Sequence, residues 1–142
     1  MRVRQFIIND IKDIELQPHQ AQWQHEINAA QFDSVVKNSW TVIDNNNKIV
    51  FIGGVYHIWE NRLAAWSLIS KDAGKNFKFI INKTIQYLNE FKGQRIECYV
   101  DPEFVQGHRF AKLLGFNCEA LLMQKFHQNG TNASMYAKFI DL

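Results

Sequence analysis

The sequence predicts an α/β protein in which a mixed central sheet of about six to seven strands has helices on both faces. The main sign is a strand–helix–strand unit formed by Leu63–Ile69, a helical period from residue 76, and Arg95–Val100. Two strands joined through a helix pair in parallel, so these strands should be parallel neighbours. The length of 142 residues, 46% of them hydrophobic and 13% aromatic, suits one core. We therefore expect a single domain over residues 1–142.

The first third of the chain predicts a strand followed by a helical region. Arg2–Ile8 alternates polar and apolar residues, as a strand with one buried face does. Asn9 or Asp10 can cap a helix, which Pro18 should break, and residues 21–32 could resume it. The residues expected to face inward from this second stretch are Trp23, Ile27 and Phe32.

A hairpin and a further strand come next. Residues 39–44 and 48–59 predict two strands joined by Asn45–Asn47, because asparagine tolerates the left-handed backbone of a turn. Gly53 and Gly54 indicate either a bulge in the second strand or a close approach to its backbone. Residues 60–62 should then turn the chain into Leu63–Ile69.

The remaining elements complete the sheet. Gly93 suits the end of the helix that begins near residue 76, and Gly115 suits the end of a helix over residues 105–114. Asn129-Gly130 is a typical hairpin turn between the last two strands. Those strands are predicted over residues 118–127 and 134–140.

Composition excludes several kinds of partner. A net charge of +2, from 16 basic and 14 acidic residues, offers no electrostatic attraction for nucleic acid or an anionic membrane. Cys98 and Cys118 make no disulfide framework, and we expect both to be buried thiols in a reducing cytoplasm. No apolar run has the length of a signal peptide or a membrane span, and the five histidines are too scattered to predict a metal site.

The loop after Leu63–Ile69 has the features of a phosphate-binding loop. A strand that ends in a glycine-bearing loop before a helix directs several backbone N–H groups outward, and together with the helix dipole they can bind phosphate. Gly74 would let the phosphate approach, and Lys71 and Lys75 could neutralise part of its charge. The alternative is an ordinary surface loop with two solvated lysines.

The motif Lys71-Asp72-Ala73-Gly74-Lys75-Asn76 resembles the acetyl-coenzyme A loop of the GNAT superfamily of N-acetyltransferases. Arg109–Phe116, which contains Leu-Gly-Phe at its end, resembles the second signature of that superfamily. The resemblance implies acetyl-coenzyme A (acetyl-CoA) as acyl donor and an amine of unknown identity as acceptor. The residues that it places at the coenzyme are Trp66, Ser67, Leu68, Lys71, Ala73, Gly74, Lys75, Asn76 and Phe77.

One position departs from the superfamily pattern. Many active members have a tyrosine four residues before the glycine of the second signature, where it protonates the departing thiolate, and this chain has Ala111. The run from Ala64 to Leu88, followed by Arg109–Gly115, is also similar to small GNAT-like proteins of tailed bacteriophages, some of them internal virion proteins. That resemblance implies an alternative, a non-catalytic protein with a structural or virion-associated role, located in the host cytoplasm or in the virion.

Four residues are candidates for proton transfer in an acetyl-transfer reaction. Glu60 or His57, at the end of the third strand, could deprotonate the attacking amine. His108 or Tyr99 could replace the missing tyrosine as the acid. The alternatives are a turn glutamate paired with Arg62, a half-buried strand histidine, a solvated helix histidine and a packed strand tyrosine.

Overall fold

The computed structural model describes residues 1–21 and 36–142, so the predicted helix over residues 21–32, with Trp23, Ile27 and Phe32, lies outside the described residues apart from Ala21. Seven strands are found in the described part. They are β1 (Arg2–Gln5), β2 (Ser39–Ile43), β3 (Ile49–Trp59), β4 (Arg62–Ile69), β5 (Arg95–Val100), β6 (Asn117–Met123) and β7 (Ala133–Phe139). The helices described are α1 (Asp10–Asp13), α2 (Pro18–Ala21), α5 (Phe77–Leu88) and α6 (Val105–Leu113), with short 3₁₀ helices η1 (Val36–Asn38) and η2 (Ala73–Asn76).

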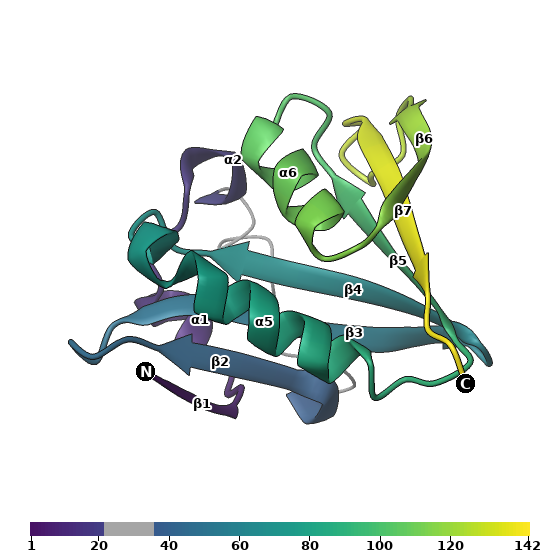
Figure 1. Ribbon diagram of the computed structural model, residues 1–142. Helices are drawn as coiled ribbons and strands as arrows, with labels where there is room; N and C mark the ends of the chain where they lie inside the picture. The colour runs from purple at the N-terminus through teal and green to yellow at the C-terminus, as the bar shows by residue number, and fades with distance from the viewer. Residues whose placement is uncertain (22–35) are drawn as a thin grey trace. The chain divides into compact units, whose positions relative to one another are not determined.

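The strands form one mixed sheet in the order β1-β2-β3-β4-β5-β7-β6 (Figure 1). β4 and β5 run parallel, with Arg62, Leu63 and Ala64 opposite Arg95, Ile96 and Glu97. The pairs β1–β2, β2–β3, β5–β7 and β6–β7 are antiparallel. The parallel strand–helix–strand unit, and with it the predicted α/β fold class, is therefore confirmed.

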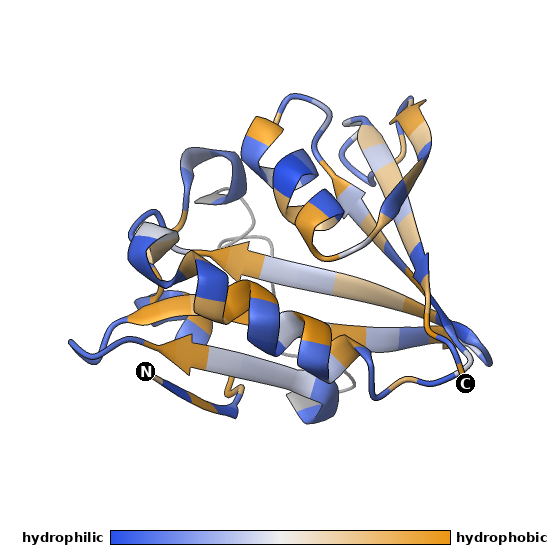
Figure 2. Ribbon diagram, viewed as in Figure 1, coloured by the Kyte–Doolittle hydropathy of each residue, from blue (hydrophilic) through white to orange (hydrophobic). Residues whose placement is uncertain are grey.

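The chain divides into two compact units. Unit 1 comprises Met1–Tyr56 and Trp66–Asn82, and unit 2 comprises His57–Ala65 and Lys83–Leu142. Strands β3 and β4 and helix α5 contribute residues to both units. Helix α5 is amphipathic, with alternating hydrophobic and hydrophilic turns visible in Figure 2, because Ile80, Thr84 and Leu88 recur on its buried side.

Unit 1 has a core on the α1 side of its strands. Phe6, Ile11, Ile14, Ile52 and Leu68 form this cluster, and Leu16, Ile49 and Trp66 pack against it. Side chains alternate along a strand, so the buried Phe51 lies on the opposite face of β3 from Ile52. Both faces of the unit 1 strands are therefore covered, as the sequence predicts.

A buried carboxylate connects α1 to the strands of unit 1. Asp10 is almost fully buried, and it accepts hydrogen bonds from the Arg4 guanidinium at 2.7 and 2.8 Å, the Ile7 amide at 3.0 Å and the Thr41 hydroxyl at 2.7 Å. Burial raises the pKa of Asp10, but these hydrogen bonds outweigh it and the pKa lies below its usual value. Asn9 takes the N-cap position of α1, which ends at Asp13.

Two sequence predictions about helix ends are wrong. Pro18 does not break a helix but begins α2, where its missing N–H costs nothing because first-turn amides have no helical partner. Gly93 lies five positions beyond the end of α5, and its left-handed φ of 76° serves the turn into β5. Gly115, with φ of 92° just after α6, fulfils the predicted role of a terminating glycine.

The glycine pair of β3 marks a close approach rather than a bulge. The register runs without interruption from Ser39 opposite Gly54 to Trp40 opposite Gly53. A Cβ on Gly54 would lie 2.1 Å from the Ser39 hydroxyl and 2.9 Å from the Trp66 indole nitrogen. The absence of a side chain at Gly54 therefore lets Trp66 and Ser39 pack over the strand.

Candidate functional site

The residues that the sequence places at the coenzyme all lie in unit 1. The loop after β4 contains the turn Lys71-Asp72, the 3₁₀ helix η2 and then α5. A Cβ on Gly74 would meet no other atom within 4 Å, and Gly74 has no left-handed backbone angle that would require glycine. Nothing within the described protein therefore explains this glycine, and the space in front of its α-carbon is open to a ligand.

The protein already uses several amides of the loop. Lys71 donates its amide to the Glu15 carbonyl, Asp72 to the Ser70 hydroxyl, and Ala73 to the Ser70 carbonyl, at 2.9, 3.0 and 3.1 Å. The Phe77 amide also has a partner, the Gly74 carbonyl. A backbone cradle for phosphate would therefore begin at the amide of Gly74 rather than at Ala73, whose side chain is buried, and would end before Phe77.

The two lysines of the loop differ in their surroundings. Lys71 forms an exposed ion pair with Glu15, 3.3 Å from nitrogen to oxygen. Lys75 is exposed in η2, and the described residues give its ammonium group no ion-pair partner. Lys75 is therefore the better placed of the two to meet a phosphate without first losing a carboxylate.

The backbone of β4 ahead of the loop has a side-chain partner that the sequence did not predict. The Gln20 carboxamide donates to the Ser67 carbonyl at 3.1 Å and accepts from the Ile69 amide at 2.8 Å. The Ile69 carbonyl accepts from the Gln17 amide at 3.4 Å. Gln20 thus satisfies backbone groups at the place where the sequence puts the pantetheine arm, which carries amides of its own.

The aromatic residue predicted beside the coenzyme belongs largely to the core. The Trp66 ring meets the Phe6 ring edge to face at a centroid distance of 5.6 Å and packs on the unit 1 cluster. Leu68 is a member of that cluster. For Leu68, therefore, only the backbone is left to face a ligand, whereas Trp66, Asn76 and Phe77 are half-buried.

The four candidates for proton transfer lie in unit 2. His57 is exposed near the end of β3, and Glu60 is exposed in the turn before β4. Arg62 pairs with Glu97, not with Glu60. Within residues 1–21 and 36–142, no hydrogen bond joins His57 or Glu60 to His108, so these candidates do not form one hydrogen-bonded group.

His108 is half-buried in α6, and both of its ring nitrogens are engaged. Nε2 lies 2.9 Å from the Pro102 carbonyl, and Nδ1 lies 2.6 Å from the Tyr136 hydroxyl. A carbonyl only accepts, so Nε2 must carry a proton, and in the neutral ring Nδ1 accepts from Tyr136. His108 is therefore neither solvated nor poised to release a proton to a ligand.

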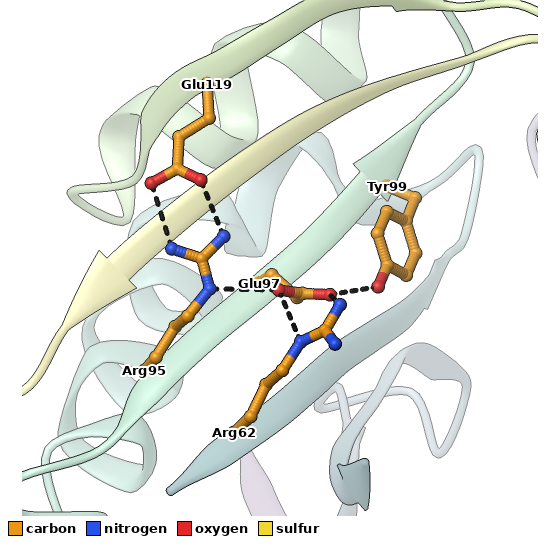
Figure 3. A network of polar contacts seen from close by, with 5 residues as sticks. All are labelled: Arg62, Arg95, Glu97, Tyr99 and Glu119. Atoms are coloured by element: carbon orange, nitrogen blue, oxygen red, sulfur yellow. Dashed lines mark hydrogen bonds and ion pairs between the residues drawn. The ribbon is translucent and has the colours of Figure 1, made fainter. Parts of the chain in front are cut away.

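Tyr99 belongs to a polar network on one face of β5 (Figure 3). Its hydroxyl donates a short hydrogen bond to Glu97, whose carboxylate also accepts from Arg62 Nε and Nη2 at 3.0 and 2.6 Å and from Arg95 Nε at 3.0 Å. Arg95 Nη1 and Nη2 donate in turn to both oxygens of Glu119, at 2.9 and 2.6 Å. The network was not predicted from the sequence.

The carboxylate at the centre of this network is strongly acidic. Glu97 is fully buried, and burial raises its pKa, but the hydrogen bonds from Arg62, Tyr99 and Arg95 outweigh this and lower the pKa to about 2. A group of that acidity stays ionised at neutral pH and is a poor proton acceptor. Glu97 in this arrangement orients the two arginines and is not a general base.

Unit 2 also contains Ala111, where the sequence comparison expected a tyrosine, and the two cysteines. Ala111 is only 3% exposed in α6. Cys98 and Cys118 lie opposite Tyr136 from either side, in β5 and β6. Burial raises the pKa of the Cys98 thiol to about 12, but Cys98 is half-buried rather than fully buried and Cys118 is exposed, so the prediction of two buried thiols is wrong for Cys118 and only partly right for Cys98.

Two further features concern metal binding and membrane insertion, in residues 1–21 and 36–142. No group of three or more histidine, cysteine, aspartate or glutamate side chains in these ranges could hold a metal ion. In the same ranges, no helix is both long and apolar enough to cross a membrane.

Comparisons with known proteins agree with the topology. The structure is similar to Ard1 from Thermoplasma volcanium, with a TM-score of 0.76 at 12% identity over 98% of this chain and 97% of the other. It is similar to a GNAT superfamily phosphinothricin acetyltransferase from Sinorhizobium meliloti in complex with acetyl-CoA, with a TM-score of 0.72 at 10% identity over 99% and 88%. A GNAT family acetyltransferase from Bacillus anthracis gives a TM-score of 0.67 at 16% identity over 96% and 93%.

No protein-family model matches the sequence, and no curated protein does. The structural likeness at 10–16% identity defines the fold. The chain therefore has the fold of the GNAT superfamily of N-acetyltransferases.

Proposed function

We propose that the protein binds acetyl-CoA through the loop between β4 and α5 and transfers the acetyl group to an amine. The observation that carries the proposal is Gly74, which has open space at its α-carbon in the loop where a phosphate would meet the start of a helix. The fold of N-acetyltransferases, one of them in complex with acetyl-CoA, supports it.

In this proposal the pyrophosphate lies against the backbone from Gly74 to Asn76 at the start of α5, with Lys75 neutralising part of its charge. The pantetheine arm takes the backbone groups of β4 near Ser67, displacing the Gln20 carboxamide that now occupies them. The whole of residues 1–142 acts as one domain, in the cytoplasm.

The amine must lose a proton for the reaction to proceed. His57 and Glu60 are the exposed candidates for this role, because His108 is engaged on both nitrogens and Tyr99 donates to Glu97. The amine attacks the thioester carbonyl, the carbon–sulfur bond breaks, and the coenzyme leaves as a thiolate that water can protonate.

A second candidate function is a non-catalytic one, structural or virion-associated, in which the fold is retained without turnover. It is favoured by Ala111, which is buried at the position of the family acid, and by the engagement of His108.

Titration calorimetry with acetyl-CoA, followed by a thiol-release assay with a panel of amines and peptides, tests both candidates. Binding with release of free coenzyme thiol in the presence of an amine supports the transferase. Binding without release, across the panel, supports the non-catalytic role. A protein that binds no acetyl-CoA at millimolar concentration refutes the proposed function.

A further inference from the structure

The face of unit 2 that carries the Glu97 network has a regular arrangement across three strands. Arg62 on β4 lies opposite Arg95 on β5, which lies opposite Phe139 on β7. The next row on the same face, two residues along each strand, contains Ala64, Glu97 and Ala137. Side chains of paired residues point to the same face, so the two arginines stand side by side with Glu97 between them and the small alanines on either side.

Glu97 orients both arginines. Its buried carboxylate accepts from Nε of both Arg62 and Arg95, which fixes the plane of each guanidinium (Figure 3). Arg62 also stacks on the ring of Trp59, 4.4 Å away, and Arg95 lies 5.6 Å from the centre of the Phe139 ring. The guanidinium of Arg95 is therefore oriented before anything binds to its two outer nitrogens.

The carboxylate that binds those outer nitrogens is Glu119, which is exposed, unlike the buried Glu97. Glu119 is 37% exposed, and it comes from β6 at the point where the register shifts between Cys118 and Ala120. Its two oxygens accept from Arg95 Nη1 and Nη2 in the parallel, bidentate geometry by which arginine recognises a carboxylate. Among the described residues Glu119 is held by Arg95 alone, whereas Glu97 is held by Arg62, Arg95 and Tyr99, so Glu119 is the carboxylate that a ligand can displace.

An exposed aromatic ring lies beside each guanidinium group. Phe139, next to Arg95, is 65% exposed, and Trp59, next to Arg62, is 62% exposed. Large exposed aromatic side chains beside an oriented charged group are typical of a binding surface.

We propose that Arg95 is a recognition site for a carboxylate attached to a flat apolar group, and that Glu119 occupies the site until such a ligand displaces it. The two nitrogens of Arg95 would bind the ligand carboxylate as they now bind Glu119, and its apolar group would cover Phe139.

The charges of the network favour a carboxylate over a phosphate. Arg62 and Arg95 carry two positive charges, and Glu97 and Glu119 carry two negative ones. When Glu119 moves into solvent, the remaining network has one uncompensated positive charge. This matches a monoanion and not a phosphate monoester, whose charge at neutral pH is about −1.5 to −2.

The site can be tested without coenzyme, so its failure would leave the proposed acetyl transfer untouched. Benzoate is titrated by calorimetry into the full chain and into Glu119→Ala, with benzamide as the neutral ligand of the same shape and inorganic phosphate as a second anion. Because the tethered carboxylate no longer competes, we expect Glu119→Ala to bind benzoate about tenfold or more tightly than the unchanged protein. Benzamide should not bind, and phosphate should bind more weakly than benzoate.

Arg95→Lys in the Glu119→Ala background is the matched control, because lysine keeps the charge and loses the bidentate fork. It should lose the gain in benzoate affinity. Should this variant not fold, Phe139→Ala in the same background changes only an exposed ring and should weaken benzoate binding severalfold. The site is refuted if removing Glu119 leaves benzoate affinity unchanged, if benzamide binds as well as benzoate, or if a folded control binds as tightly as its parent.

A last titration distinguishes the two sources of such a carboxylate. A short peptide ending in phenylalanine is compared with its C-terminal amide and with benzoate on Glu119→Ala. Tighter binding of the free-acid peptide than of benzoate would identify a polypeptide C-terminus as the ligand. Equal binding of both acids would identify a small aromatic acid.

Discussion

Replacing Gln20 by alanine should increase the affinity of the protein for acetyl-CoA. In the structure the Gln20 carboxamide donates to the Ser67 carbonyl at 3.1 Å and accepts from the Ile69 amide at 2.8 Å. These are the backbone groups that the proposed pantetheine position requires. The coenzyme must therefore break two hydrogen bonds of the free protein before it makes its own.

The size of the effect follows from those two bonds. Each contributes about 0.5–1.5 kcal/mol net, so displacing Gln20 costs about 1–3 kcal/mol. At 1.4 kcal/mol for each factor of ten, Gln20→Ala should tighten acetyl-CoA binding by about 5- to 150-fold. The free variant should also lose stability, by about 1–3 kcal/mol, because the Ile69 amide belongs to a buried residue and is left without its acceptor.

The assay is calorimetric titration of acetyl-CoA, with urea denaturation to measure the free energy of unfolding. Gln17→Ala is the control, since Gln17 lies in the same segment and is hydrogen-bonded to β4 through its backbone amide, which alanine keeps. The control should leave the affinity within about twofold of the original protein. Weaker or unchanged binding by a folded Gln20→Ala variant would refute the idea that Gln20 occupies the coenzyme position.

Three other outcomes follow from the geometry. Gly74→Val should abolish acetyl-CoA binding in calorimetry without lowering the melting temperature, because the valine side chain would enter open space. Lys75→Ala should weaken acetyl-CoA binding by only about 1 kcal/mol, and equal losses of affinity from the two variants would argue against a backbone cradle. The pKa of Glu97 is lowered from 4.5 to about 2, so its contribution, about 3 kcal/mol, is present above pH 4.5 and lost as pH falls towards 2. In Glu97→Gln the free energy of unfolding, measured with urea, should fall less steeply as the pH is lowered from 4.5 to 2. An unchanged dependence on pH would contradict the lowered pKa of Glu97. In the native protein a thiol reagent should modify the exposed Cys118 rapidly and Cys98 slowly, because the raised pKa of Cys98 keeps its half-buried thiol protonated. Cys118→Ser should therefore remove the fast phase seen by mass spectrometry.

Local signals explain what the sequence predicted correctly. The strand Arg95–Val100 was predicted with the limits that the structure has, because it lies between a helix with a regular apolar period and a proline-containing loop. The parallel pairing of β4 and β5 follows from the helix between them, whatever their side chains are. Gly115 ends its helix because a left-handed residue is needed there.

Predictions that depended on distant contacts were less accurate. The first strand ends at Gln5 and not at Ile8, because Phe6 enters the core while the Ile7 amide turns to Asp10. The sixth strand ends at Met123, four residues before the predicted limit, His127. In both places the apolar pattern continues past the strand, so the pattern alone could not locate its end.

The Glu97 network could have been predicted from the sequence, whereas the contact of Gln20 with β4 could not. Glu97 stands in the middle of an apolar strand, and a charge that is buried there needs partners. Arg95 is two positions away on the same face and Arg62 begins the parallel strand, so the pairing could have been inferred once β4 and β5 were aligned. Gln20 offered no such signal, because its contact with β4 depends on how residues 16–20 return to the strand.

The buried alanine at the acid position separates coenzyme binding from catalysis. A general acid typically contributes about 10²–10⁴-fold, and neither Ala111 nor His108, whose Nε2 donates to Pro102, offers a free proton. The leaving group is a thiolate, however, and thiols with a pKa of about 8.5 leave far more readily than alcohols. Acetyl transfer without a protein acid is therefore slow but chemically accessible, with water protonating the sulfur. The residues proposed to hold the coenzyme lie in unit 1, whereas the acid position lies in unit 2, so loss of the acid leaves the proposed coenzyme site unchanged. Slow turnover would consequently not argue against the transferase, whereas failure to bind acetyl-CoA would.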